Sequence, residues 1–230
     1  MDVVSVNVRF GGSNVAARAG RIARSVKDLV PNFESVLFFV QECSAPALIA
    51  IRREIGDTHV AFARPNYRTH IGPFVATFVP LRCSVVAVSW HRTPHTTMWR
   101  DYHTILLALG PKKQKAKEKE QETETEPDPK EKETEKEEEK EKEKEKEKEK
   151  EGLRVRVEVY NVHLDSCKEN VRRRKAQVAS IARESSGPFA ILGDLNDRVK
   201  LVCHGIDART VATWRVRGTD HKARLYRLTL

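Results

Sequence analysis

The stretch Phe189–Arg198, which reads FAILGDLNDR, is the feature that most constrains the fold. Its first four residues form a short apolar run with an aromatic and a β-branched residue, which predicts a strand buried on both faces. The run stops at Gly193, and Asp194, Asn196 and Asp197 follow at once. A buried strand that ends in acids and amides places hard oxygen ligands at the rim of a core, which suits Mg²⁺. Taken alone, the same residues fit an ordinary Asp/Asn/Gly turn equally well.

A long charged stretch, Pro111 to Glu151, interrupts the chain. It is almost wholly Lys, Glu, Gln, Thr, Pro and Asp. Its Lys-Glu alternation places like charges four positions apart and opposite charges three apart, so a helix would gain little net support. With no apolar face to bury, the stretch is predicted to be disordered or a lone solvated helix. We therefore expect one folded domain with halves at 1–110 and 152–230, and an insert at 111–151 that is either a tolerated hairpin-tip insertion or a tether or nuclear address.

The net charge of +9 is unevenly distributed along the chain. The insert contains 14 Lys against 18 acidic residues, so the remainder carries +13. A folded part this basic favours an anionic partner. The candidates are nucleic acid, a phosphorylated small molecule such as an inositol phosphate, or an acidic membrane surface contacted peripherally.

Cysteine spacing and hydropathy exclude several classes. The four cysteines are widely spaced, without a Cys-x-x-Cys pair, which argues against a disulfide framework or a zinc site and favours a reducing compartment. The chain begins with a strand pattern rather than a signal peptide, and no apolar stretch reaches membrane-spanning length. We expect an intracellular protein, cytoplasmic or nuclear, with no transmembrane segment.

Hydrophobic periodicity predicts strands and helices in alternation. A period near 3.6 predicts helices over 14–30, 46–55 and 170–184, and short apolar or alternating runs predict strands. The predicted strands lie at 3–8, 35–40, 60–63, 72–80, 84–90, 102–109, 153–163, 189–192, 211–216 and 224–230. This order favours mixed sheets covered by helices, an α/β or α+β domain, over an all-α or all-β domain.

Polar side chains recur where the predicted strands end. The positions are Asn7, Glu42, Asn161 with His163, and Asp194 with Asn196; Asp220-His221 precedes the last strand. One such position is weak evidence, because a strand-end Glu or His is commonly a turn or surface residue. Five in one small domain are harder to attribute to turns alone.

In this order, these pieces resemble the endonuclease/exonuclease/phosphatase superfamily of metal-dependent phosphoesterases. The matching motifs are VNVR at 6–9, VQE at 40–42, NVHLDS at 161–166 with RRRKAQ at 172–177, LGDLND at 192–197 and TDH at 219–221. NVHL, GDLN and TDH together are specific, and the resemblance spans essentially the whole folded part. It implies a four-layer α/β/β/α sandwich of two packed mixed sheets, with a site for Mg²⁺ or Mn²⁺ at one end.

The resemblance also implies roles for the residues of the metal site. Glu42 would be the main metal ligand, with Asn7 beside it in the outer shell of the metal. Asp194 would orient or deprotonate the attacking water, and Asn196 would hold the phosphate and the nucleophile. In-line attack on a phosphoester needs these functions, because a water must be aligned and the phosphate charge neutralised.

The remaining predicted site residues contact the substrate. His163 and His221 would contact non-bridging phosphate oxygens, and Asp220 would complete the site. Asn161 and Arg198 are further predicted substrate contacts.

The C-terminal part departs from the superfamily pattern. Members usually have a long segment between GD-x-N and the final Asp-His pair, and that segment includes an Asp that orients the last histidine. Here only Leu195 to Thr219 separates the two motifs, and Asp207 is a poor substitute because its spacing is too short. A degenerate member that acts as a binding scaffold therefore stays open as an alternative to an active hydrolase.

Arg198 bears on the choice of substrate. GDLN followed one residue later by Arg is similar to the inositol polyphosphate 5-phosphatase branch, although residue 197 is Asp rather than aromatic. GD-x-N-D, which is also present, is common in the nuclease branches. Because a guanidinium can grip a phosphate through two hydrogen bonds, the sequence slightly favours an inositol phosphate or phosphoinositide. The basic cluster Arg172–Lys175 is the best argument for the alternative, a nuclease acting on DNA or RNA.

Overall fold

The residues on either side of the charged insert pack together. The computed structural model describes residues 1–68, 72–83, 85–96, 98, 100–109, 155–196, 201–215, 219 and 221–229. Residues 1–107 and 156–230 form one compact unit, and residues 108–155 form a separate one. The predicted insert at 111–151 lies outside the described residues.

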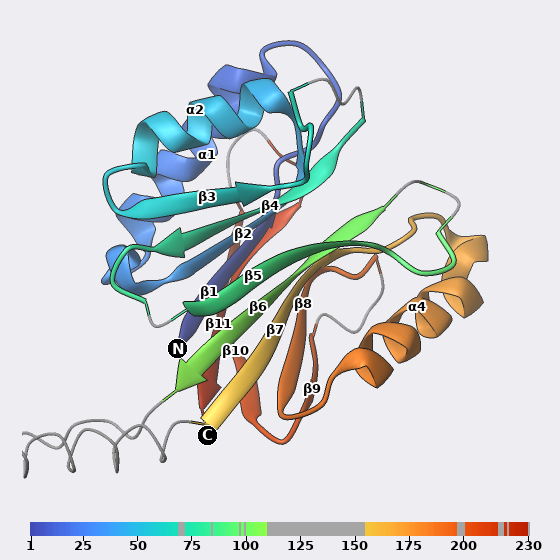
Figure 1. Ribbon diagram of the computed structural model, residues 1–230. Coiled ribbons are helices and arrows are strands. Elements are labelled where there is room, and N and C mark those ends of the chain that lie inside the picture. The colour runs from blue at the N-terminus through green and yellow to red at the C-terminus, as the bar shows by residue number, and fades with distance from the viewer. Residues whose placement is uncertain are drawn as a thin grey trace, which may run out of the picture. The chain divides into compact units, whose positions relative to one another are not determined.

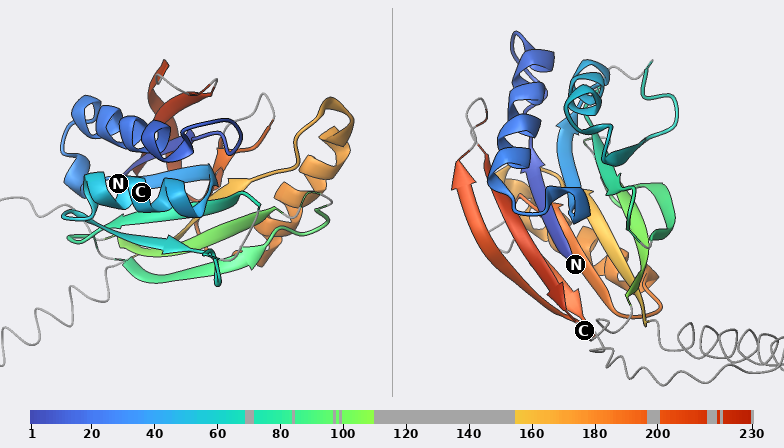
Figure 2. Two further views of the ribbon diagram at one scale, coloured as in Figure 1. Left: turned by 90° about the horizontal axis from the view of Figure 1, so that it is seen from above. Right: turned by 90° about the vertical axis from the view of Figure 1, so that its left-hand side faces the viewer.

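The compact unit is a four-layer sandwich, which confirms the predicted fold class. Helices α1 and α2 cover the outer face of one sheet, α4 lies on the outer face of the other, and the two sheets pack against each other (Figure 1, Figure 2). The helical segments are α1 (Val15–Leu29), η1 (Phe33–Ser35), α2 (Ala45–Ile55), η2 (Lys168–Asn170) and α4 (Val171–Glu184). The strands are β1 (Asp2–Asn7), β2 (Leu37–Cys43), β3 (His59–Ala63), β4 (Phe74–Pro80), β5 (Val85–Arg92), β6 (Asp101–Leu109), β7 (Val155–His163), β8 (Phe189–Asp194), β9 (Leu201–His204), β10 (Asp207–Arg215) and β11 (Lys222–Thr229).

Both sheets are mixed. Among the described residues, the first sheet has the order β10-β11-β1-β2-β4-β3 and the second the order β5-β6-β7-β8-β9. Strands β1 and β2 run parallel, and so do β7 and β8. Parallel neighbours present their carboxyl ends at the same edge of a sheet. The motif residues at the ends of these four strands are therefore brought to two sheet edges.

The first sheet and its helices share one apolar core. Ser44 caps the N-terminus of helix α2, because its Oγ accepts the Ala47 N–H at 3.5 Å. Pro46 occupies the first turn, where its missing N–H costs nothing. The buried face of α2 packs with that of α1 against the aromatic side chains Phe38, Phe74 and Phe78 of β2 and β4. None of the described helices combines the length and the apolarity needed to span a bilayer.

Two C-terminal strands differ from the sequence prediction. Strand β9 was not predicted, because LVCH is short and follows the charged sequence DRVK. Strand β10 begins at Asp207 rather than at Val211, and its residues are mostly half-exposed or exposed. A strand that buries little apolar surface leaves a weak hydrophobic pattern, so its start is difficult to predict.

A chain of buried polar side chains links the two sheets. Gln41 of β2 donates through Nε2 to Asn161 Oδ1 of β7 at 2.8 Å, and Asn161 Nδ2 donates to the Ala76 carbonyl at 2.9 Å and to Thr77 Oγ1 at 3.0 Å. Thr77 Oγ1 in turn lies 2.8 Å from His103 Nδ1 on β6. Because unpaired polar groups are costly between packed sheets, these bonds specify how the sheets register on each other.

His103 predicts a loss of stability in acid. Burial, with a smaller effect from His91, lowers the pKa of His103 to about 3 from its ordinary value of 6.5. Below pH 6.5 the unfolded chain therefore binds a proton that the folded chain does not, so stability falls as the pH drops towards 3. This single group is expected to remove about 2 kcal/mol between pH 7.5 and pH 5.

Urea unfolding at the two pH values measures this effect. The variant His103→Gln keeps a polar partner for Thr77 but cannot titrate, so its stability should fall less on acidification. An equal fall in the variant and the parent chain would contradict the assignment to His103.

Candidate functional site

Three predicted site residues from three strands meet at one point. The Asn7 side chain, at the end of β1, donates through Nδ2 to Glu42 Oε1 of β2 at 3.0 Å and to Asp194 Oδ2 of β8 at 2.9 Å. One amide nitrogen therefore bridges two carboxylates that come from different sheets. The predicted convergence of Glu42 and Asp194 is observed, whereas their roles stay predictions.

The backbone of β2 is distorted where it presents Glu42. The pairing between β2 and β4 shifts between Val40 and Cys43, and Glu42 has a φ of 51°. A left-handed conformation is unfavourable for a residue with a side chain, and bulges of this kind turn side chains away from the regular alternation. The second carboxylate oxygen of Glu42 accepts the Phe10 N–H at 2.9 Å, which fixes the side chain from the loop after β1.

Asp194 and Asn196 are positioned by a tight turn after β8. The Asn196 N–H donates to Asp194 Oδ1 at 3.1 Å, and Asn196 Nδ2 donates to the Leu164 carbonyl at 2.8 Å. Asn196 has a φ of 50°, a conformation that Asn tolerates better than most residues. The turn therefore joins the ends of β7 and β8 and holds the Asp194 carboxylate towards Asn7.

His163 is buried behind the two carboxylates and is oriented by Arg100. A guanidinium can only donate, so Arg100 Nη1, 3.1 Å from His163 Nδ1, makes that nitrogen an acceptor. The ring proton then sits on Nε2, which lies 3.7 Å from Glu42 Oε1. Burial and the Arg100 charge lower the pKa of His163 to about 4, which leaves the ring neutral near pH 7.

The sequence interpretation did not include Arg100. It directly precedes β6, the residue is 8% exposed, and its charge acts on the carboxylates of the site. No local pattern singles it out, because it lies at the beginning of a strand rather than at the end of one.

His221 lies on the open side of the site. Its Nδ1 is 3.4 Å from Asp194 Oδ2, and its side chain is 36% exposed. The backbone N–H of His221 donates to Thr219 Oγ1 at 3.1 Å, and Thr219 Oγ1 donates to the Asn7 carbonyl at 2.9 Å. Thr219 thus ties the TDH segment to the end of β1.

Asp207 does not orient His221. It pairs with Thr229, at the far end of β11 from His221. The predicted site residues Asp220 and Arg198 lie outside the described residues.

Asn161 differs from its predicted role as a substrate contact. It is fully buried, and both its amide oxygen and its amide nitrogen are engaged between the sheets. Along β7, Asn161 and His163 point to the same face, but only His163 is close to the strand end. The structure therefore gives Asn161 a place in the buried network instead of at the mouth of the site.

The charges of the site favour a cation. Burial alone would raise the pKa values of Glu42 and Asp194, but hydrogen bonds from Asn7 and backbone N–H groups, together with neighbouring His163, lower both below their ordinary values. Both groups are therefore ionised near neutral pH, and one neutral amide stands between two negative charges.

The donor set fits a hard divalent ion. In the described part of the chain, no three His, Cys, Asp or Glu side chains gather closely enough to hold a metal by themselves. Mg²⁺, however, is commonly held by one or two carboxylates, with water and substrate phosphate completing its shell. Glu42 and Asp194 supply such oxygen donors at one point.

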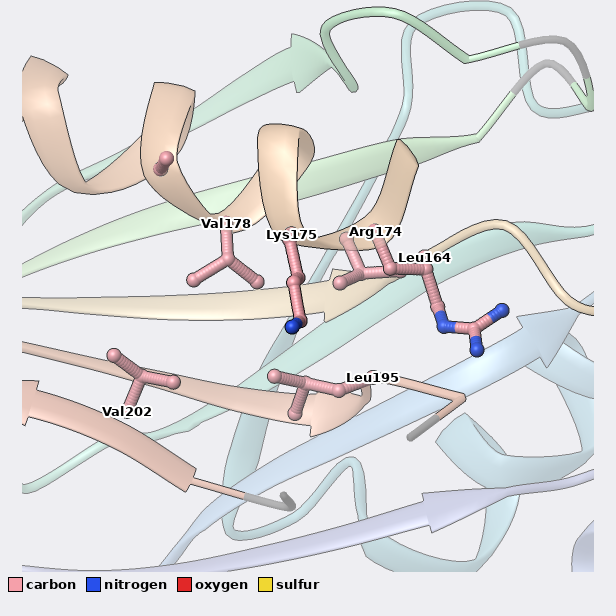
Figure 3. A pocket seen from close by; sticks show the side chains of 7 residues that line it. Leu164, Arg174, Lys175, Val178, Leu195 and Val202 are labelled. Carbon is pink, nitrogen blue, oxygen red and sulfur yellow. The ribbon is translucent and has the colours of Figure 1, made fainter. Parts of the chain in front are cut away.

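An apolar cavity of about 240 Å³ lies between α4 and strands β8 and β9. Figure 3 shows Val178 and Lys175 pointing from α4 towards Leu195 and Val202 on the strand side. The cavity wall also includes Leu164, which directly follows His163. The apolar cavity therefore contacts the residue that directly follows His163 of the polar site, and it lies on the helix-covered face of the second sheet.

Structural comparison identifies the class of fold. No protein-family model matches the sequence, and no curated protein sequence matches it. A truncated TDP2 from Caenorhabditis elegans is similar over 99% of this chain and 83% of that chain, with a TM-score of 0.59 and 18% identity. Against a longer structure of the C. elegans protein, the chain covers 64% of that chain.

Two further solved structures are similar. D. rerio TDP2 complexed with single strand DNA product matches over 100% of this chain and 83% of that chain, with a TM-score of 0.56 and 14% identity. An endonuclease/exonuclease/phosphatase from Bacteroides vulgatus matches over 99% of this chain and 86% of that chain, with a TM-score of 0.55 and 11% identity.

These likenesses define the fold, an α/β sandwich of two packed mixed sheets. The chain has the endonuclease/exonuclease/phosphatase fold, so the predicted resemblance is confirmed at the level of the fold.

Proposed function

We propose that this chain hydrolyses phosphoesters with the help of a divalent cation. The observation that carries the proposal is the bridge from Asn7 to the ionised side chains of Glu42 and Asp194, with His163 and His221 beside them. Such a site combines oxygen donors for a hard cation with a carboxylate and imidazoles for the reacting phosphate. Glu42, with Asp194, would hold Mg²⁺ or Mn²⁺, and the cation would supply charge neutralisation at the phosphate.

The residues of this chain supply the remaining functions. Asp194 is held by Asn7 and by the Asn196 N–H, so its carboxylate is aimed without rearrangement and can orient the attacking water. His163 keeps its proton on Nε2 because Arg100 occupies Nδ1, so this ring is a neutral donor. His221, on the open side, contacts the incoming phosphate.

The substrate class favoured by the structure is a nucleic-acid strand. Arg174, in the first turn of α4, donates through Nη1 to the carbonyl of Asp165, which lies two residues after His163. This hydrogen bond fixes the first turn of α4 to the chain segment that follows His163. Arg172 and Lys175 on this turn are exposed, so a basic surface begins next to the site. The similar D. rerio TDP2 structure holds a single strand DNA product, which supports the same choice.

An inositol phosphate or phosphoinositide is the second candidate. The observation that favours it is the spacing of Arg198 after GDLN. Because Arg198 lies outside the described residues, this candidate rests on the sequence motif.

A substrate panel tests the proposed function. Purified protein is incubated with Mg²⁺ or Mn²⁺ and, separately, single-stranded DNA, single-stranded RNA, abasic duplex DNA, inositol polyphosphates and phosphoinositide vesicles. We expect shortening of single-stranded nucleic acid that stops when EDTA is added and returns with excess Mg²⁺.

The same panel contains the contradicting outcomes. Phosphate release from the inositol substrates alone would favour the second candidate. If no substrate is hydrolysed at metal concentrations that saturate related hydrolases, the scaffold alternative would be favoured over a phosphoesterase.

A further inference from the structure

A groove runs between helix α2 and the outer strand β3 of the first sheet. It has a volume of about 620 Å³, and its walls include Ile49 and Arg53 of α2, Val60 and Ala61 of β3, and Leu81. Ile49, Val60 and Leu81 are 54%, 45% and 61% exposed. Large apolar side chains gathered at one surface groove mark an interaction site more often than scattered ones do. In Figure 1, α2 lies alongside β3, above the sheet.

Strand β3 presents an open hydrogen-bonding edge to this groove. Among the described residues β3 is the terminal strand of its sheet. The Leu81 N–H donates to the Thr58 carbonyl, and hydrogen-bonded pairs alternate in an antiparallel ladder. The register then turns the N–H and C=O groups of Val60 and Phe62 towards β4, and those of His59, Ala61 and Ala63 towards the open side.

The sequence of β3 contains none of the residue types that commonly prevent strand pairing at a sheet edge. HVAFA contains no proline, lysine or acidic residue, although natural edge strands commonly carry such residues to prevent pairing. An unprotected edge beside a helix is the geometry in which an extended peptide adds a strand to a sheet.

The charged wall of the groove is cationic. Arg52 and Arg53 are exposed and line the groove from the last turn of α2. The neighbouring acidic residues face helix α1 instead. Glu54 Oε1 lies 2.7 Å from Arg24 Nη2, and Asp57 Oδ2 lies 3.9 Å from Lys27 Nζ. The groove therefore offers apolar contacts, positive charge and backbone hydrogen bonds together.

We infer that this groove binds an extended segment of a partner protein in which acidic and apolar residues alternate, and that the segment adds as a strand to the open edge of β3. The acidic side chains of the segment face Arg52 and Arg53 on the α2 side of the sheet, and its apolar side chains lie on the opposite face, beside Val60. Charge complementarity selects an acidic rather than a basic segment.

This surface is separate from the candidate catalytic site. Cys43, which follows Glu42, pairs with Phe74 at one end of β4, whereas His59 pairs with Pro80 at the other end. Partner binding at the groove therefore leaves the mouth of the site open, and the inference goes beyond the proposed function.

Fluorescence anisotropy with a labelled peptide of alternating Glu and Val tests the inference on the full chain. We expect saturable binding at near-physiological ionic strength, and no binding of the corresponding Lys-Val peptide. Arg53→Glu should weaken binding by about fivefold or more, because an attraction becomes a repulsion. Ile49→Asp should also weaken it, because it places a negative charge on the α2 side, beside the acidic side chains of the segment. Arg21→Glu, an exposed reversal on the neighbouring helix α1, is the matched control and should leave binding unchanged.

A backbone-modified peptide separates strand addition from simple charge capture. N-methylation of alternate residues keeps the side chains but removes the peptide N–H groups that would pair with β3, so the modified peptide should fail to bind. Equal binding of the modified peptide, equal weakening by Arg21→Glu, or no binding of the Glu-Val peptide would each overturn the inference. So would a dimer of the chain that Ile49→Asp dissociates, or binding to anionic lipid vesicles that Arg53→Glu abolishes, because each assigns the groove to another occupant.

Discussion

Replacing Asp194 by Asn is expected to lower phosphoester hydrolysis by about 10²- to 10⁴-fold, the range that a positioned general base contributes. The substitution keeps the shape of the side chain, but its single amide oxygen accepts either the Asn7 Nδ2–H or the Asn196 N–H, whereas the carboxylate accepts both. The loss of that hydrogen bond is offset by the weaker charge repulsion between residues 194 and 42. The lost feature is the negative charge that orients the attacking water. The midpoint of thermal unfolding should therefore move little, since the carboxylate is at the rim and does not fill the core. The measurements are kcat on the active substrate of the panel and thermal unfolding of the same preparation.

Glu42→Gln is the companion variant. Its amide removes the charge that we propose holds the cation, so the activity loss should be accompanied by a higher Mg²⁺ concentration for half-maximal rate. Asp207→Asn is the matched control, because Asp207 is exposed and lies far along β11 from His221. Full activity in Asp194→Asn, or an equal loss in Asp207→Asn, would contradict the proposed roles.

The sequence predicted much of the candidate site because the site is built from strand ends. Apolar runs that stop at a polar residue are visible in sequence, and two parallel pairs deliver their ends to neighbouring sheet edges. That logic located Asn7, Glu42, His163 and Asp194 without any knowledge of the sheet order. The alternation of strands and helices also favoured mixed sheets covered by helices over an all-α or all-β domain, whereas the four-layer sandwich was implied by the resemblance to the superfamily.

The errors and omissions come from contacts between segments that are distant in sequence. Asn161 has the same strand-end character as His163 but lies two residues further in, where the opposite sheet covers it. Arg100 reaches His163 across 63 positions of sequence, and nothing in its neighbours indicates that contact. Side-chain partners of this kind depend on how the two sheets register, which local periodicity does not encode.

The backbone conformation explains why glycine precedes Asp194 in the central motif. Gly193 has a φ of 126°, a conformation that residues with side chains rarely adopt. A Cβ atom at this position would lie 2.2 Å from the Val162 carbonyl oxygen and 2.9 Å from the Val162 nitrogen. Both contacts are with the backbone of β7, which has no flexible end that could move aside.

Gly193→Ala is therefore expected to destabilise the fold by about 3 kcal/mol or more, the combined effect of backbone strain and overpacking. Gly187→Ala is the matched control, since the nearest atom to its added Cβ is the Arg156 carbonyl oxygen at 3.9 Å. Urea unfolding of the two variants measures the difference, and equal stabilities would show that β7 and β8 approach less closely than described. Because β7 carries His163 and β8 carries Asp194, separating the strands also displaces the two sides of the site. Activity in Gly193→Ala should consequently fall even at temperatures where the variant is folded, whereas Gly187→Ala should retain it.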